Sequence, residues 1–168
     1  MIVVSDSTPL ITLMKARQLP ILHHLFGEVL IPEAVFEELT TNETYKDEAD
    51  LIRSESYIRV VSVANTEYVA ILQRATGLDL GESEAIVYAD ENKADVLLID
   101  EVAGRRVAQN MSLPIAGSIG ILLLAFDRGL LNACEAEKAL KRIENSGRHI
   151  SRHLLQNARN AIHGETNS

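Results

Sequence analysis

The stretch Ile2-Val3-Val4-Ser5-Asp6-Ser7-Thr8-Pro9 decides the fold class of this chain. Its apolar run predicts a buried strand over residues 2–5. A helix is predicted to open at Thr8 and Pro9, with Thr8 as its cap and the proline tolerated in the first turn. A strand that leads directly into a helix is typical of α/β proteins. Open parallel sheets build their sites at the C-terminal ends of their strands, which is where we expect Asp6.

A second apolar run, Val96-Leu97-Leu98-Ile99, ends just before Asp100, and a helix is predicted to follow it. If the two strands are parallel, Asp6 and Asp100 lie at the same edge of the sheet. Each aspartate also has a purely structural interpretation. Asp6 can cap the first helix, and Asp100 can cap the helix after it, with Glu101 favouring the positive end of that helix.

The rest of the chain alternates between strand and helix patterns. Further strands are predicted over residues 29–31, 58–63 and 113–115. Helices are predicted over about 19–26, 32–39, 66–75, 79–89, 102–109, 118–127, 134–143 and 154–162. The acidic segment 40–56 is expected to be a loop with one helical turn around 49–52. This alternation predicts an α/β fold with a right-handed, mainly parallel sheet.

Composition limits the classes of protein to consider. The chain has 168 residues, 46% of them hydrophobic, which suits one domain spanning 1–168. Its net charge of −8 repels polyanions, so nucleic-acid binding requires a local basic patch or bound cations. The single cysteine, Cys134, forms no intramolecular disulfide and favours a reducing cytoplasm. We predict no signal peptide and no membrane span.

Three glutamates are further candidates for the same edge. Glu38 precedes the inward-facing Leu39 on the helix that Pro32 starts. Glu82 stands three residues after Asp79, which is the spacing of a capping box. Glu84 has no such capping role, so we expect Glu84 to be a ligand and Glu82 to be its neighbour.

A group of carboxylates at one sheet edge suits a divalent metal ion. Mg²⁺ and Mn²⁺ take oxygen ligands and leave positions for water and phosphate. Metal ions of this kind promote phosphodiester hydrolysis without a nucleophilic side chain. The sequence contains no nucleophile elbow, no glycine-rich phosphate loop and no histidine or cysteine cluster with metal-ligand spacing.

These motifs, in this order, resemble those of the PIN-domain family. The resemblance rests on Val3-Val4-Ser5-Asp6-Ser7-Thr8, on Pro32 to Glu38-Leu39, on Gly81-Glu82-Ser83-Glu84-Ala85-Ile86 and on Leu97-Leu98-Ile99-Asp100. It covers about residues 1–130, with C-terminal helices over 131–163. Gly104-Arg105-Arg106-Val107-Ala108 and Gly117-Ser118-Ile119-Gly120 add to a likeness with a prokaryotic branch similar to VapC-like toxins of toxin–antitoxin pairs.

The resemblance implies a three-layer α/β/α fold around a mainly parallel sheet of four to five strands. It implies RNA cleavage with Mg²⁺ or Mn²⁺, and it assigns Asp6, Glu38, Glu84 and Asp100 as catalytic metal ligands, with Glu82 beside them. It also implies a homodimer and a small antitoxin-like partner. The sequence departs from the family pattern in two places: the third acid is Glu where many relatives have Asp, and Ile99 stands where many have Ser or Thr.

Other polar residues are candidates for substrate contacts. Ser7 and Thr8 follow Asp6 directly, and Arg105 and Arg106 follow Asp100 by about one helical turn, so any of them can lie near a phosphate. The arginines are equally well explained as solvated helix charges. The tail over residues 146–163 is basic and can contact RNA phosphates or an acidic partner, although a solvent-facing helix explains it too. His149 and His153 are expected to be surface residues rather than metal ligands.

Two functions remain open from the sequence. The first is a divalent-metal-dependent endoribonuclease, the toxin of a two-component pair. The alternative is a catalytically degenerate PIN-like module that binds RNA or a protein without cleaving.

Overall fold

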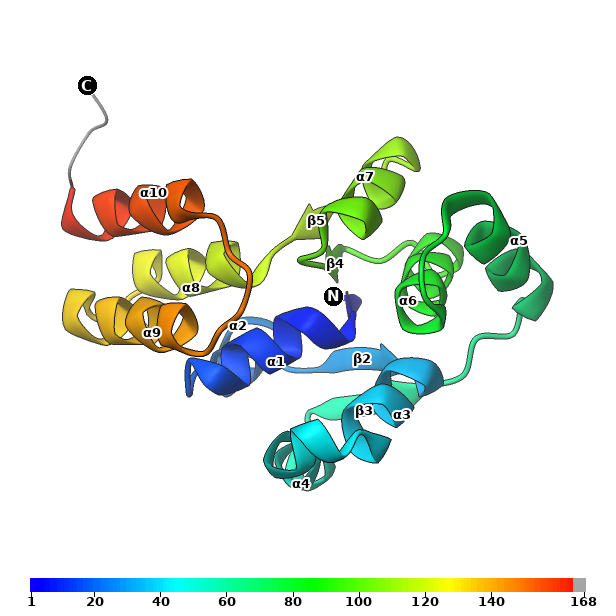
Figure 1. Ribbon diagram of the computed structural model, residues 1–168, viewed down its shortest axis with the longest axis horizontal. Helices are drawn as coiled ribbons and strands as arrows, with labels where there is room; N and C mark the ends of the chain where they lie inside the picture. Colours follow the sequence, from blue (N-terminus) through cyan, green and yellow to red (C-terminus); the bar gives the residue numbers. More distant parts are fainter. Residues whose placement is uncertain (165–168) are drawn as a thin grey trace.

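The computed structural model describes residues 1–164. Five parallel strands form one sheet in the order β3-β2-β1-β4-β5 (Figure 1). The strands are β1 (Val3–Ser5), β2 (Val29–Pro32), β3 (Ile58–Val61), β4 (Val96–Leu98) and β5 (Ile115–Ala116). All four pairings are parallel, which confirms the predicted sheet.

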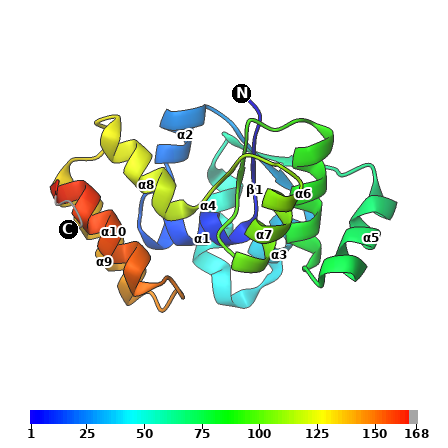
Figure 2. The same cartoon turned by 90° about the horizontal axis from the view of Figure 1, so that it is seen from above.

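Helices cover both faces of the sheet, so the strands are apolar on both sides (Figure 2). Because side chains alternate along a strand, Val3 and Leu98 enter one hydrophobic cluster, while Val4 and Leu97 enter the other. The first cluster includes residues of α1 (Ser7–Lys15), α2 (Ile21–Phe26), α3 (Glu33–Thr41), α4 (Lys46–Ser54), α8 (Ser118–Asp127), α9 (Ala133–Asn145) and α10 (Arg152–His163). The second includes residues of α5 (Thr66–Thr76), α6 (Leu80–Glu91) and α7 (Val102–Asn110). The result is the three-layer α/β/α architecture expected from the sequence.

The topology places a natural site between β1 and β4. From β1 the chain builds outward through β2 to β3, and it then returns to add β4 on the other side of β1. Open α/β sheets bind ligands at such a switch point, beyond the C-terminal ends of the strands. Ser5 and Leu98 are register partners at these ends, and the backbone N–H of Asp6 donates to the carbonyl of Leu98 at 3.0 Å. The switch point therefore lies beside Asp6.

Four local predictions were wrong. Residues 43–54 form a short 3₁₀ turn (Glu43–Tyr45) followed by α4, not a loop with one turn, because Ala49 and Ile52 pack inward at helical spacing. The other errors lie at element ends. Helix α1 begins at Ser7, so Thr8 is not its cap. Strand β3 ends at Val61 rather than at residue 63, and β5 covers Ile115–Ala116 rather than 113–115. No helix within residues 1–164 is both long and apolar enough to cross a membrane.

Candidate metal site

Asp6 is a buried carboxylate without a partner. It follows β1 directly and occupies the N-cap position of α1, yet its side chain makes no capping hydrogen bond. Its exposed fraction is 1%, and neither carboxylate oxygen has a hydrogen-bond partner within the described chain. The capping interpretation of Asp6 therefore does not explain this side chain. Buried polar groups are nearly always satisfied, so an orphaned carboxylate marks a site that something else completes.

Burial raises the pKa of Asp6 from its ordinary value of 3.8 to about 8. The amide of Ser7 opposes this rise, whereas the nearby charges of Glu82, Asp79 and Glu38 add to it. Desolvation and like charges both disfavour the ionised carboxylate. Near neutral pH, Asp6 therefore retains its proton unless a cation replaces it.

Helix α3 supplies Glu38, whose side chain is half-buried. A Cβ added at Gly81 would lie 3.3 Å from Oε2 of Glu38 and 3.6 Å from Oδ1 of Asp79, so both carboxylates border the same glycine. Burial raises the pKa of Glu38, and Asp79 adds to the effect. A hydrogen bond with Ser7 and the charge of Arg148 act in the opposite direction.

The start of α6 supplies Asp79 and Glu82. They form the predicted capping box, in which the N–H of Glu82 donates to Asp79 Oδ1 at 2.8 Å and the N–H of Asp79 donates to Glu82 Oε2 at 3.4 Å. Burial raises the pKa of Glu82, with Asp79 as the next contributor and with Glu101 and Glu38 adding. Glu82 is thus a cap and, at the same time, a member of the acidic group around Asp6.

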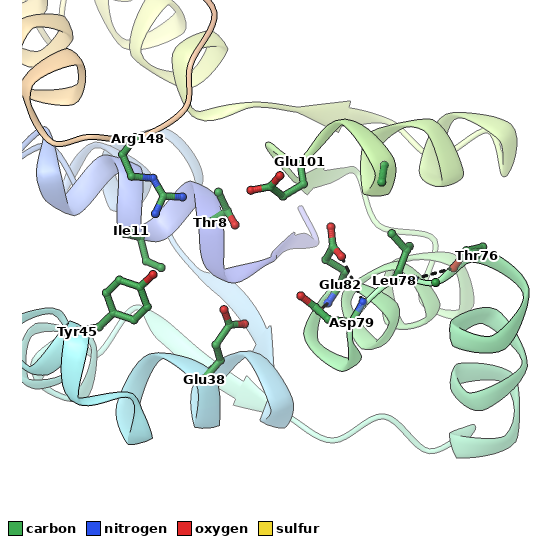
Figure 3. Close-up of a pocket in the computed structure, with 12 residues that line it drawn as sticks. Thr8, Ile11, Glu38, Tyr45, Thr76, Leu78, Asp79, Glu82, Glu101 and Arg148 are labelled. Atoms are coloured by element: carbon green, nitrogen blue, oxygen red, sulfur yellow. Dashed lines mark hydrogen bonds between the residues drawn. The ribbon is translucent and has the colours of Figure 1, made fainter.

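The acids around Asp6, but not the buried Asp6 itself, line a pocket of about 440 Å³ (Figure 3). Glu38 from α3, Asp79 and Glu82 from α6, and Glu101 from the loop after β4 all border it, and Arg148 reaches it from the loop before α10. Thr8, Ile11, Tyr45, Thr76, Gly77, Leu78 and Ala103 complete its lining. Four carboxylates around a single guanidinium make this pocket strongly acidic.

Glu84 lies elsewhere. Its Oε2 accepts a hydrogen bond at 3.0 Å from the backbone N–H of Ala34, in the first turn of α3. A carboxylate at that position satisfies an unpaired amide and complements the helix dipole. Glu84 neither borders the acidic pocket nor contributes to the raised pKa of Asp6. Side chains two positions apart on a helix point in nearly opposite directions. Glu82, rather than Glu84, is the one whose charge acts on Asp6.

Asp100 is held at the start of α8. Its Oδ1 accepts from the Ser118 N–H at 2.7 Å, and its Oδ2 accepts from the Ser118 hydroxyl at 2.9 Å and the Thr12 hydroxyl at 3.4 Å. The expected capping role is therefore real, but the capped helix is α8 and not α7. Asp100 borders a second pocket that adjoins the acidic one, and Glu101 borders both.

The predicted substrate residues have different surroundings. Ser7 is buried beside Glu38, and Thr8 borders both pockets. Arg105 donates to the carbonyl of Ile99 at 2.8 Å and borders the second pocket. Arg106 is exposed and borders neither pocket.

Asp79, Glu101 and Arg148 line the acidic pocket although the sequence did not single them out as site candidates. Asp79 was identified only as a cap, and Glu101 only as a charge near a helix start. Arg148 was one cation among several in the tail.

Within residues 1–164, no three Asp, Glu, His or Cys side chains stand close enough, as placed, to hold a metal ion. His149 precedes α10, so His149 and His153 do not share a helix.

A family model described as a PIN domain matches residues 2–163. The chain belongs to the PIN-domain family. Comparison with the curated proteins and with the solved structures gives no match. The PIN-domain fold is, in general, a nuclease fold, and the acidic pocket of this PIN domain lies at the sheet edge where the topology places a site.

Gly104 allows α7 to pack against the acidic group. A Cβ there would lie 2.5 Å from Cδ1 of Ile99 and 2.8 Å from Oε1 of Glu82. We expect Gly104→Ala to lower the free energy of unfolding by about 1–2 kcal/mol in urea titrations, because overpacking outweighs the helix propensity gained. Gly120→Ala on α8, where nothing lies within 4 Å of the added Cβ, is the matched control and should be neutral or stabilising. Equal stability of the two variants would contradict this account of Gly104.

Proposed function

We propose that this PIN domain is a divalent-metal-dependent nuclease that cleaves RNA, with Asp6 as the central metal ligand. The observation that carries the proposal is the buried carboxylate of Asp6, which has no hydrogen-bond partner and is surrounded by other carboxylates. A buried carboxylate among other carboxylates raises the free energy of the fold when no cation is present, and a bound cation offsets that cost.

The residues present fit Mg²⁺ or Mn²⁺. The donors around Asp6 are carboxylate oxygens, which these hard ions prefer. Glu38, which is half-buried, and Glu82, which is buried, are the acids that would join Asp6, because the charges of both already raise its pKa. Asp100, oriented by Ser118, follows the neighbouring strand β4 and borders the adjoining pocket. When bound, the ion would supply the positive charge that activates water and neutralises charge developing on the phosphate.

The chain's own residues then have separate tasks. Asp6 would hold the cation as a carboxylate, in place of the proton that its pKa of about 8 favours in the metal-free chain. The capping box with Asp79 fixes the start of α6 and so limits where Glu82 can reach. The hydroxyls of Ser118 and Thr12 both donate to Oδ2 of Asp100 and so fix the orientation of its carboxylate.

Purified protein should cleave single-stranded RNA in the presence of Mn²⁺ or Mg²⁺. Activity should disappear with a chelator and return when excess metal is added, as followed on a fluorescently labelled RNA and on DNA of the same sequence. Cleavage that survives chelation would contradict the metal dependence. Binding of RNA without cleavage of either substrate would favour the catalytically degenerate module instead.

A further inference from the structure

We propose that Arg148 is a resident counter-cation of the acidic pocket, which a divalent metal ion has to displace, and that Arg148 thereby sets the metal concentration at which the site fills. The inference rests on the proposed metal site and names a residue that controls its affinity. It is carried by the position of Arg148 among the acids, by its unpartnered guanidinium and by the space beside it.

Arg148 places a positive charge where the other charged groups are negative. Among the residues that line the acidic pocket, it is the one base, and four are carboxylates: Glu38, Asp79, Glu82 and Glu101. Figure 3 shows Arg148 and Glu38 facing the same space from different elements. The charge of Arg148 lowers the pKa of Glu38, against the effect of burial. In the metal-free protein the guanidinium therefore partly neutralises the acids, which is also what a bound metal ion would do.

No close contact ties the guanidinium of Arg148 to the fold. The side chain is half-buried, yet it makes no ion pair or hydrogen bond with residues 1–164. In contrast, Arg159 on α10 is held by Glu137 at 2.9 Å and by Glu144 at 2.8 Å. Attraction to the acids over a longer distance is what favours the position of Arg148. A second cation that takes over this attraction can therefore release the side chain.

The backbone that carries Arg148 is fixed on both sides. Gly147, just before it, has φ of +76° and ends α9 with a left-handed turn. Just after it, Ile150 packs on the core, and its N–H donates to the carbonyl of Arg148 at 3.0 Å. The hydroxyl of Ser151 then accepts from the N–H of Leu154 at 3.1 Å to cap α10. The side chain of Arg148, rather than its loop, is thus the part that we expect to move.

The second pocket gives the displaced side chain a place to go. It has a volume of about 1020 Å³, and Arg148 borders it as well as the acidic pocket. The guanidinium can turn into this space and remain hydrated while its backbone stays in place. Displacement of Arg148 therefore needs no rearrangement of the fold.

Two cations in one small pocket repel each other. A divalent ion has twice the charge of a guanidinium, so the acids favour the ion once enough of it is present. At low metal concentration Arg148 has the advantage, because it is tethered beside the pocket. Removal of its charge should therefore tighten metal binding, and salt should weaken this effect by screening the repulsion.

Isothermal titration calorimetry with Mn²⁺ alone, on protein freed of metal by a chelator, tests the proposal. Arg148→Gln removes the charge and keeps a polar side chain, whereas Arg148→Lys keeps the charge. Arg152→Gln is the matched control, because Arg152 is exposed at the start of α10 and borders neither pocket. We expect Arg148→Gln to bind Mn²⁺ about tenfold more tightly than the wild type, and both other variants to stay within about threefold of it. Raising KCl from about 0.05 M to about 0.5 M should reduce the tenfold difference to about threefold or less.

Urea unfolding gives a second readout that does not depend on activity. Without metal, Arg148→Gln should unfold at a lower urea concentration than the wild type, because the acids lose their counter-charge. With saturating Mn²⁺ this difference should vanish or reverse. Circular dichroism confirms that each variant is folded. The double variant Asp6→Asn with Arg148→Gln should show no tight Mn²⁺ binding, which places the titrated ion at the acidic group.

The outcomes separate this inference from the proposed function. Equal or weaker Mn²⁺ binding by Arg148→Gln overturns the inference and leaves the metal site standing. Equal tightening by Arg152→Gln also overturns it, because net charge alone would then explain the effect. So does a higher KM for RNA in Arg148→Gln with unchanged Mn²⁺ affinity, since Arg148 would then act on the substrate. Absence of Mn²⁺ binding by both the wild type and Arg148→Gln contradicts the proposed metal site itself, and the inference fails with it.

Discussion

Asp6→Asn should abolish metal-dependent cleavage and, at the same time, stabilise the metal-free protein at neutral and alkaline pH. Loss of the central carboxylate removes the metal, so we expect activity to fall by about a thousandfold or more, which is on the order of 4 kcal/mol of transition-state stabilisation. The gain in stability follows from the raised pKa of Asp6. Asn has the shape of the protonated acid and never ionises.

The direction of the pH effect is fixed by linkage. The pKa of Asp6 is about 8 in the folded chain against an ordinary 3.8, so the folded state binds more protons between these values. Stability of the wild type therefore falls as pH rises from about 4 to 8 and levels off above. A pKa difference of about four corresponds to at most about 5 kcal/mol of lost stability. Because the protein relaxes around the charge, we expect Asp6→Asn to be more stable than the wild type by about 2–3 kcal/mol at pH 8.

Urea titrations of the wild type and of Asp6→Asn at pH 5 and pH 8, with metal chelated, measure this difference in the free energy of unfolding. Mn²⁺ should then stabilise the wild type and leave Asp6→Asn unchanged, since only the wild type gains a bound ligand. An Asp6→Asn variant that is less stable than the wild type at pH 8 would show that the carboxylate is satisfied in a way that the structure does not contain.

Glu82→Gln should reduce activity strongly, whereas Glu84→Gln should not. Glu82 is one of the acids around Asp6, so its loss should lower cleavage by about a hundredfold. Glu84 accepts from Ala34 at the start of α3, so its neutralisation should lower stability by about 0.5–1 kcal/mol and leave kcat within about threefold. Cleavage rates at saturating Mn²⁺ and urea unfolding of both variants measure these effects.

This pair of variants is its own control, because both remove one charge from the same helix. The reverse result, with Glu84→Gln inactive and Glu82→Gln active, would mean that α6 rotates or shifts when metal binds. The order of acids that the family resemblance implied would then hold after all.

The sequence predicted the sheet and its edge because those features depend on local patterns. Short apolar runs that end in Asp6 and before Asp100 require buried strands, and the alternation with helices requires parallel pairing. The order of the strands, which makes β1 and β4 neighbours, depends on long-range packing. That order is what brings the ends of these two strands together.

The choice between Glu82 and Glu84 could not be made from helical spacing alone. Both are on the first turns of α6, and a capping box gave Glu82 a sufficient structural role. In the structure Glu82 completes the capping box and is also one of the charges that raise the pKa of Asp6. Arg148 was equally hard to single out, because only the return of the chain after α9 brings it to the pocket.

Several expectations stay predictions. The homodimer, the small antitoxin-like partner and the toxin role rest on the family resemblance, and the family match itself reaches no further than a PIN domain. Asp100 as a metal ligand also stays a prediction, since its oxygens already accept hydrogen bonds from Ser118 and Thr12.

The most direct test of the account is anomalous diffraction from crystals of the wild-type protein grown with Mn²⁺. We predict a peak at roughly 2.2 Å from a carboxylate oxygen of Asp6, with Glu38 or Glu82 turned to the same ion. A fully occupied Mn²⁺ elsewhere in the molecule, with the oxygens of Asp6 still unpartnered, would contradict it.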